Sequence, residues 1–331
     1  MDIIGTILWP LKWAVELLLV GWHLLWTAIG LDPAAGITWV LSIVGLVLVV
    51  RAALIPLFIK QIKSQRKMLE IAPQMKKVQE KYKGKRDQAS REAMSRETME
   101  LYKKHGTSPV SGCLPLLVQM PIFFALFSVL NDAQKSKAGV GPLNETLAVQ
   151  FGDANLFGIA PLHTSMQAAL AGNPVNWAVV IIAAVMVILM CASQFITQLQ
   201  IVSKNMSAET KASPQFKQQR ILLYILPFVF LFSGFAFPLG VMFYWLTSNA
   251  WTMVQQFLVI RNMPTPGSDA AKAREERLAR KGKLMTPNGD VISISEAPVP
   301  EKKTPTQRQQ PMGKARAKKQ QTDGRDKQEY R

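Results

Sequence analysis

The sequence predicts an all-α polytopic membrane protein, and three observations support this fold class. Apolar residues make up 49% of the 331 residues while the formal net charge is +17, an unusual pairing for a soluble globular protein. The two properties are separated along the chain, because 110–130, 176–200 and 221–260 contain no charged residue and 37–59 contains only Arg51. These stretches reach the roughly 20 residues that a helix needs to cross the hydrocarbon core.

The last uncharged stretch is too long for a single crossing, because it covers forty residues. Pro238-Leu239-Gly240 near its middle is a turn signal. We therefore expect a core at 35–262 that includes an outer loop at 131–175. The five spans of this core are expected at 37–59, 110–130, 176–200, 221–237 and 240–260.

Lysine and arginine residues gather on alternate connections between these spans. Of the 39, fourteen lie in 60–109, four in 201–220 and seventeen from Arg261 onward. The positive-inside rule assigns such connections to the cytoplasm. The expected topology is therefore a multi-pass protein of the plasma membrane, with its N-terminus outside and its C-terminus in the cytoplasm.

The first 34 residues form a separate apolar segment. On a helix, Lys12, Glu16, His23 and Thr27 fall on one narrow stripe that is flanked by tryptophans. Amphipathic helices in the membrane interface place polar groups and Trp at headgroup level. Residues 1–34 are therefore expected to form an interfacial helix, with an additional span as the alternative.

The connection at 61–107 is patterned as two helices rather than as a plain linker. Apolar residues recur at helical spacing on both sides of KGKRD at 83–87, which supplies a turn. These residues are therefore expected to form an αα-hairpin in the cytoplasm. Its charges are typical of a solvated face. An adaptable binding face is the alternative for its methionines, Met68, Met75, Met94 and Met99.

The tail at 263–331 is rich in Lys, Arg, Gln and Pro and has few large apolar residues, which predicts disorder. The chain from Arg261 onward holds seventeen basic and nine acidic residues. Three roles suit this positive charge: setting the membrane topology, binding anionic lipid, or binding ribosomal RNA. No specific DNA contact is expected.

We find no catalytic constellation in the sequence. It contains no GxxxxGK[ST] phosphate loop, no GxSxG elbow and no HExxH helix. The three histidines are isolated, and Cys113 and Cys191 both lie in predicted spans, so neither zinc spacing nor a disulfide framework is present. The sequence therefore predicts a protein that is not an enzyme and that uses no metal or cofactor.

Polar residues at membrane depth are the candidate functional residues, because each unsatisfied polar group in the bilayer is costly. Arg51 lies nine residues before Lys60. That separation is about 13 Å along a helix, too far for the guanidinium to snorkel unaided to the headgroups. A charge within a span is by default a functional candidate. Snorkelling, or a hydrogen bond between helices, is the alternative.

The other candidates lie in the middle and inner half of the membrane, as expected for a wet recess that opens to the cytoplasm without crossing the bilayer. Together with Arg51, the candidate groove residues are Gln119, Gln194, Trp245, Ser248, Asn249, Thr252 and Gln255. Trp245, Ser248, Thr252 and Gln255 recur at spacings of 3, 4 and 3, which is one helical face. Helix packing is the alternative role for the Gln and Ser side chains.

A transporter or channel and a structural assembly protein are the rival function classes. A channel needs polar groups through the whole depth of the membrane. The outer half offers few beyond Thr38, Ser42 and Ser233, which disfavours transport.

Three runs of sequence closely resemble the YidC/Oxa/Alb membrane protein insertases, over roughly 37–262. They are RAALIPL from Arg51, SPVSGCLPLLVQMPIFFALF from Ser108 and FPLGVMFYWLTSN from Phe237. The resemblance implies a five-helix core with a groove that is open to cytoplasm and lipid and closed outside. It also implies that Arg51 is the groove arginine, and that Gln194 and Trp245 match the groove glutamine and aromatic residue of the family.

The partners implied by this resemblance are nascent membrane proteins, the lipid bilayer, the ribosome and the Sec translocon. We expect Arg51 to attract acidic residues of a nascent chain transiently, while the apolar helix of that chain partitions into lipid without nucleotide. No cysteine precedes Cys113, so a lipoprotein anchor is not expected, and neither is a large outer domain. The basic tail and the Trp-rich N-terminus are similar to actinobacterial members.

Overall fold

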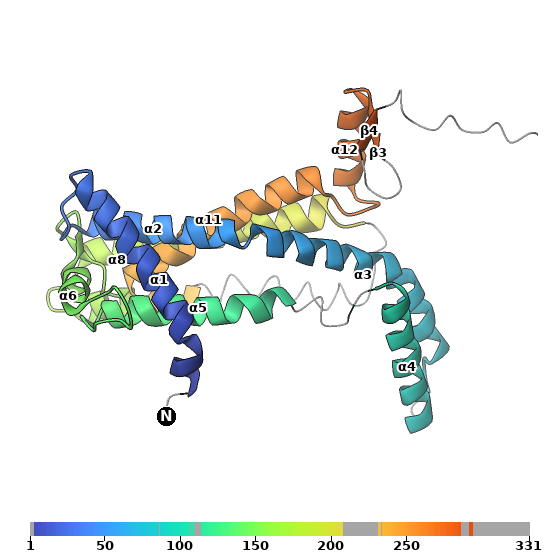
Figure 1. The fold of residues 1–331 in the computed structure, drawn as a ribbon, viewed down its shortest axis with the longest axis horizontal. Coiled ribbons are helices and arrows are strands. Elements are labelled where there is room, and N and C mark those ends of the chain that lie inside the picture. The colour runs from blue at the N-terminus through green and yellow to red at the C-terminus, as the bar shows by residue number, and fades with distance from the viewer. Residues whose placement is uncertain are drawn as a thin grey trace, which may run out of the picture. The chain divides into compact units, whose positions relative to one another are not determined.

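The computed structural model describes residues 3–85, 87–106, 108, 114–207, 231–232, 234–285 and 291–293. The chain falls into two units, Met1–Arg274 and Glu275–Arg331. In the first unit, long helices pack into a bundle (Figure 1). The helices of the bundle are α1 (Ile3–Ala28), α2 (Gly36–Ala53), α5 (Leu114–Ala133), α8 (Trp177–Leu199) and α11 (Leu239–Asn262).

Within the described residues, three helices are long and apolar enough to cross a membrane. They cover Gly5–Ala28, Gly36–Ala53 and Trp177–Lys204. The predicted class, an all-α polytopic membrane protein, is therefore confirmed. The count of five spans stays a prediction, because the expected span at 221–237 lies mostly outside the described residues.

The expected first span at 37–59 is divided between two helices. α2 ends at Ala53, and α3 (Ile55–Lys81) begins after Leu54. Pro56 has no backbone N–H to give to the carbonyl of Ala52, four residues earlier, and its ring crowds that carbonyl. The helix therefore breaks just after Arg51, and the segment expected to begin the hairpin at 61 begins in the structure at Ile55.

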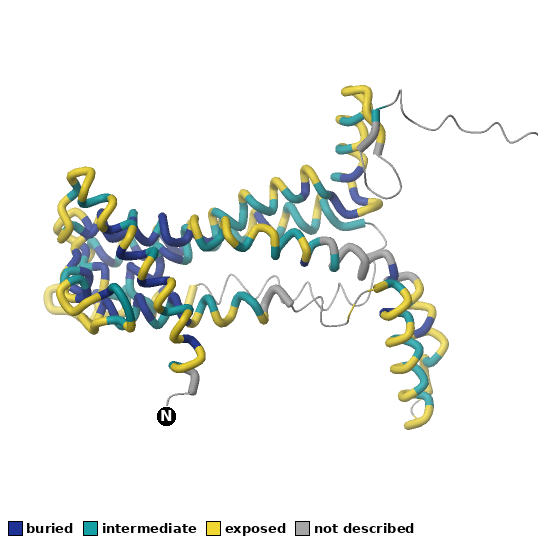
Figure 2. The backbone as a smooth tube through the Cα atoms, viewed as in Figure 1, coloured by how far each residue is buried: buried dark blue, intermediate teal, exposed yellow. Residues whose placement is uncertain are grey.

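The core of the first unit lies at the end of the bundle near α6 (Glu145–Asp153), where Figure 2 shows most of the buried residues. α1 crosses α2 and α5 obliquely, while α11 packs against α2 and α8 (Figure 1). The largest fully buried side chains on these helices are Leu19, Trp39, Ile43, Leu46, Leu126, Leu130, Met190 and Leu239.

Two residues in the polar stripe of α1, Glu16 and His23, are packed against other parts of the protein. Glu16 is 1% exposed and accepts hydrogen bonds from the backbone N–H groups of Val140 and Gly141, at 2.8 and 2.7 Å. His23 is also 1% exposed, and its ring stacks on Trp39 with 3.9 Å between ring centroids. At Glu16 and His23 the stripe therefore faces protein, and the interfacial position of the helix stays a prediction. Periodicity shows a polar stripe without showing what covers it.

The predicted outer loop at 131–175 is largely ordered. After α6 come β1 (Asn155–Leu156) and β2 (Ala160–Pro161), which pair antiparallel with Leu156 opposite Ala160, and then α7 (Met166–Ala171). An isolated bridge between Asn155 and Ala35 attaches this hairpin to the start of α2. The side chains of Asn144 and Asn176 accept hydrogen bonds from backbone N–H groups in the first turns of α6 and α8.

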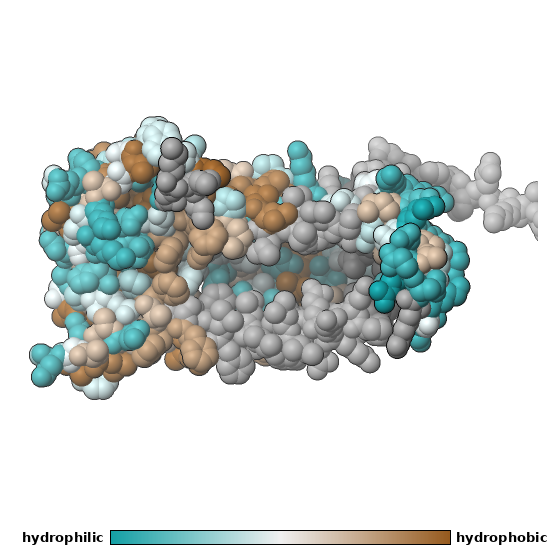
Figure 3. Space-filling model, turned by 90° about the horizontal axis from the view of Figure 1, so that it is seen from below, coloured by the Kyte–Doolittle hydropathy of each residue, from teal (hydrophilic) through white to brown (hydrophobic). Residues whose placement is uncertain are grey.

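α3 and α4 (Gln88–Lys104) form an antiparallel helical hairpin in the range where one was expected. Lys81 and Glu97 form an ion pair at 2.9 Å, and His105 Nε2 lies 3.2 Å from Gln74 Oε1. The hydrogen bond between the exposed side chains of Lys81 and Glu97 raises the pKa of Lys81 and lowers the pKa of Glu97. Figure 3 shows a hydrophilic surface over this hairpin.

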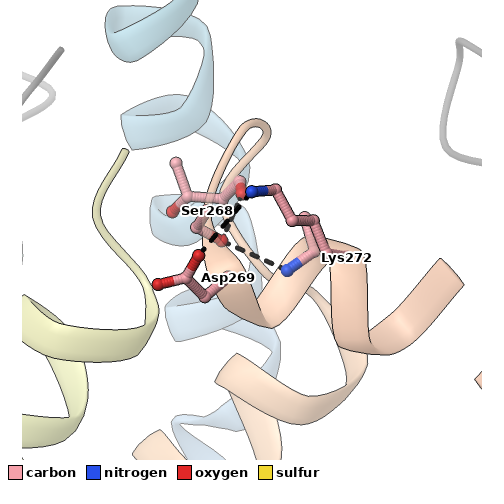
Figure 4. A network of polar contacts seen from close by, with 5 residues as sticks. Ser268, Asp269 and Lys272 are labelled. Atoms are coloured by element: carbon pink, nitrogen blue, oxygen red, sulfur yellow. Dashed lines mark hydrogen bonds and ion pairs between the residues drawn. The ribbon is translucent and has the colours of Figure 1, made fainter. Parts of the chain in front are cut away.

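The chain after α11 is tied to the end of α8, where a π-helical turn, η2 (Gln200–Lys204), follows. Asn205 Oδ1 accepts a hydrogen bond from the backbone N–H of Thr265 at 2.8 Å. Ser268 Oγ accepts a hydrogen bond from the backbone N–H of Ala271 at 3.2 Å, at the start of α12 (Asp269–Ala279). Within α12, Lys272 Nζ lies 3.9 Å from Asp269 Oδ1 (Figure 4).

The tail was expected to be disordered over 263–331, and this is wrong for its first part. Besides α12, β3 (Lys283–Met285) pairs antiparallel with β4 (Val291–Ser293). The sequence of α12 is rich in Ala, Glu and Arg, which are strong helix formers. Residues 286–290 and 294–331 lie outside the described residues.

Candidate functional site

Arg51 and Ser248 are brought together by the packing of α2 against α11. The guanidinium Nη2 of Arg51 donates a hydrogen bond to Ser248 Oγ. Arg51 is half-buried in the last turn of α2, where a cation interacts favourably with the helix dipole. Ser248 is 5% exposed, and the buried Tyr244, one turn earlier on α11, is close enough to interact electrostatically with Arg51.

Among the residues that the structure describes, most of the donor capacity of Arg51 is not used. A guanidinium carries five N–H donors, and Ser248 accepts one of them. No carboxylate of the described residues forms an ion pair with Arg51. A positive group in this state can accept an anionic side chain from another molecule without first losing a partner.

Further along α11, the polar side chains on the same face bond mainly within the helix. Thr252 Oγ1 donates to the backbone carbonyl of Ser248 at 2.8 Å. Gln255 Oε1 accepts from the indole Nε1 of Trp251 at 2.8 Å. Asn249 is half-buried, and its Nδ2 is buried without a hydrogen-bond partner among the residues that the structure describes. The predicted stripe on this helix therefore exists, with Ser248 as the member that contacts Arg51.

Trp245 belongs to an aromatic cluster that the sequence analysis missed. Its ring is parallel to that of Phe123 on α5, with centroids 6.2 Å apart, and meets the edge of Phe237 at 5.0 Å. Phe127 continues the cluster against both Phe123 and Phe237. The spacing of four between Phe123 and Phe127 was the available signal, because such residues share a helical face.

The two remaining candidates are placed on neighbouring helices and form no hydrogen bond with Arg51. Gln119 is half-buried on α5, one turn before Phe123. Gln194 is half-buried on α8, which packs against α11. Neither side chain is hydrogen bonded to a described residue. From below, Figure 3 shows hydrophilic side chains in the middle of the molecule, next to an apolar surface.

A family profile described as "60Kd inner membrane protein" matches residues 30–266 of this chain. The chain belongs to this family. The match includes α2, α3, α4, α5, α8 and α11, and with them every candidate groove residue. Together with the apolar helices it shows a multi-pass protein of the cell membrane, in a family that is not a classical enzyme family.

Three relatives of this chain carry the name "Membrane protein insertase YidC". The protein from Tropheryma whipplei (strain Twist) is 45% identical over 322 residues, which cover 96% of this chain and 98% of the relative. The protein from Bifidobacterium longum is 36% identical over 324 residues, covering 94% and 95%. The protein from Streptomyces avermitilis is 42% identical over 285 residues, covering 85% and 64%.

Proposed function

We propose that this membrane protein insertase admits the hydrophilic end of a nascent membrane protein to a groove centred on Arg51. The chain is an insertase of its family, and nascent membrane proteins are its substrates. The groove lies between α2, α5, α8 and α11, and is lined by Arg51, Gln119, Gln194, Trp245, Ser248, Asn249, Thr252 and Gln255. The observation that carries this proposal is that Arg51, within the described part of the chain, is paired with one neutral hydroxyl and with no carboxylate.

The physical task of an insertase is to lower the barrier that a hydrophilic segment meets in hydrocarbon. A charge at membrane depth attracts acidic residues more strongly than the same charge in bulk water, because screening is weaker there. Hydrophobic partition of the apolar substrate helix into lipid then provides the driving force for release. This scheme needs no nucleotide and leaves no residue covalently changed.

The proposed topology places the N-terminus outside and the basic hairpin and tail in the cytoplasm. The densely packed end of the bundle, near α6, then faces outward and closes the groove on that side. The α3–α4 hairpin projects toward the incoming nascent chain. α1 lies in the outer interface, in agreement with its oblique crossing of α2 and α5 (Figure 1).

Insertion by reconstituted proteoliposomes tests the role of Arg51. Substrates would be single-span proteins that differ only in the acidic residues of their N-terminal segments. Arg51→Ala should impair the acidic substrates most, whereas Arg51→Lys should retain much of the activity. Lys60→Ala is the matched control, because Lys60 is an exposed cation on the next helix.

Two outcomes would contradict the proposal. Equal activity of Arg51→Ala on all substrates would show that Arg51 serves helix packing alone. Failure of the unaltered protein to insert any substrate, together with passage of ions or solutes, would favour a transporter or channel.

The tail is proposed to contact the ribosome through ribosomal RNA, and the Sec translocon is a further proposed partner for some substrates. Residues 294–331 hold ten of the basic residues and follow every described element, so deleting them leaves the Asn205–Thr265 contact intact. The deletion should weaken co-sedimentation with ribosomes, and binding of the full chain should fall steeply with salt. Unchanged co-sedimentation would refute the ribosome contact.

A further inference from the structure

The β1–β2 hairpin carries an exposed apolar tip whose residues the turn geometry does not favour. Phe157 and Gly158 both have positive φ, 55° and 74°, and the N–H of Ile159 donates to the carbonyl of Leu156 at 3.2 Å. Turns with two positive φ values favour Asn, Asp or Gly at the first position. Phe157 occupies it here and is 76% exposed, and Ile159 is 57% exposed. A bulky apolar residue at this position therefore has a role outside the turn.

The tip lies beside the first turns of two helices that are long and apolar enough to span the membrane. Asn176, which caps the start of α8, donates from Nδ2 to the carbonyl of Ile159 at 3.2 Å. Phe157 lines the same cavity as Ile37, in the first turn of α2. The hairpin is thus attached to both helices at the level where they begin.

Each of these helices continues the apolar surface of the tip along its own exposed face. On α8, Trp177, Ile181, Val185 and Ile188 follow one another at spacings of 4, 4 and 3 and are 49–66% exposed. On α2, Ile37 and Leu48 are 38% and 42% exposed. Such stripes on spanning helices face lipid. The tip is the end of this apolar surface. Trp177, the first residue of α8, directly follows Asn176, which is bonded to the tip, and Trp is enriched at the membrane–water boundary.

We infer that the β1–β2 hairpin is a membrane-dipping element, with Phe157 and Ile159 buried among the lipids of the leaflet on its own side of the membrane. The occupant of this surface is lipid, because the surface is continuous with the lipid-facing stripes of α2 and α8. Asp32 and Asp153, which line the same cavity as Phe157, place carboxylates next to the tip, at headgroup level. The hairpin therefore enters only the boundary region of the bilayer. This inference does not rest on the proposed groove.

Spin-label accessibility in the full-length protein tests this inference directly. Single cysteines at Phe157, Ile181 and Glu145 would be introduced with Cys113→Ser and Cys191→Ser, and labelled in vesicles of phosphatidylethanolamine and phosphatidylglycerol. Glu145 is exposed at the start of α6 and is the water control, and Ile181 is the lipid reference. The Phe157→Cys label should collide preferentially with oxygen over a water-soluble nickel complex, as the Ile181→Cys label does.

A second label keeps the proposed anchor in place. A spin label at Ile159→Cys, in a chain that keeps Phe157, should also collide preferentially with oxygen over the nickel complex. Adding Phe157→Asn, which suits positive φ, should raise the nickel accessibility of this label by about tenfold, because burial of a Phe side chain in an apolar phase favours the inserted state at least that strongly. Circular dichroism of Phe157→Asn checks that the fold is kept.

Two results would overturn the inference. Labels at 157 and 159 that are as accessible to nickel as the label at 145 would place the tip in water. Labels that neither oxygen nor nickel reaches would show that protein covers the tip, either a partner or a second copy of the chain.

Discussion

The buried carboxylate of Glu16 should fix the loop at residues 139–143 to α1. Its two oxygens accept the N–H groups of Val140 and Gly141, at 2.8 and 2.7 Å, and the side chain is 1% exposed. Hydrogen bonds to charged groups contribute about 1.5–3 kcal/mol each. Glu16→Gln keeps one acceptor oxygen and turns an amide N–H₂ toward the other backbone donor. The expected loss is therefore about 2 kcal/mol in the local stability of the loop.

Hydrogen exchange at the amides of Val140 and Gly141 measures this loss. A cost of 2 kcal/mol corresponds to about a 30-fold increase in the open population, and exchange should accelerate by that factor. Glu145→Gln is the matched control, because Glu145 is exposed and makes no hydrogen bond to this loop. Exchange that is unchanged in Glu16→Gln, or equally fast in Glu145→Gln, would refute the argument that Glu16 holds the loop.

Three further predictions follow from packing and charge. Gly139→Ala should destabilise the loop, because its Cβ would lie 2.3 Å from the Glu16 carboxylate, and calorimetry should show a smaller cost in a Glu16→Ala background. Trp245→Ala should lower the free energy of unfolding by about 2–3 kcal/mol, because the ring contacts with Phe123 and Phe237 are lost. Trp245→Phe should retain much of these contacts, and thermal unfolding of both variants measures the difference. The lowered pKa of Glu97 means that its pair with Lys81 contributes above the ordinary Glu pKa and is lost as the pH falls through the lowered value. The protection factors of the amides in α3 and α4, corrected for the intrinsic pH dependence of exchange, should therefore fall in acid, and Glu97→Gln should remove that dependence.

The sequence predicted the spanning helices best where charge is absent. The ends of α8 and α11 lie within two residues of the expected spans 176–200 and 240–260, because lipid tolerates so few charges that a span's ends are marked by composition. The break after Ala53 was not predicted, although Pro56 marks it in the sequence. A long apolar run hides such a break, because hydropathy does not report backbone hydrogen bonding.

The site was only partly predictable. Arg51 and Ser248 stand out because each is polar within an apolar run, and packing brings them together. The aromatic cluster around Trp245 does not stand out, since Phe123 and Phe237 read as ordinary lipid-facing residues. The partners of Glu16 were also hidden, because backbone N–H groups have no sequence signature.

The contrast between the two buried or half-buried charges, Glu16 and Arg51, argues for their different roles. Glu16 is fully enclosed, and both of its oxygens are satisfied by donors that the fold fixes in place. Arg51 is only half-buried and donates to a single neutral hydroxyl, without a carboxylate partner among the described residues. A charge that serves stability needs complete pairing, because burial without it is costly. A charge that serves a passing substrate needs the opposite, since each internal partner would have to be displaced. On this reasoning Glu16 holds the fold, and Arg51 is the residue that we propose meets the nascent chain.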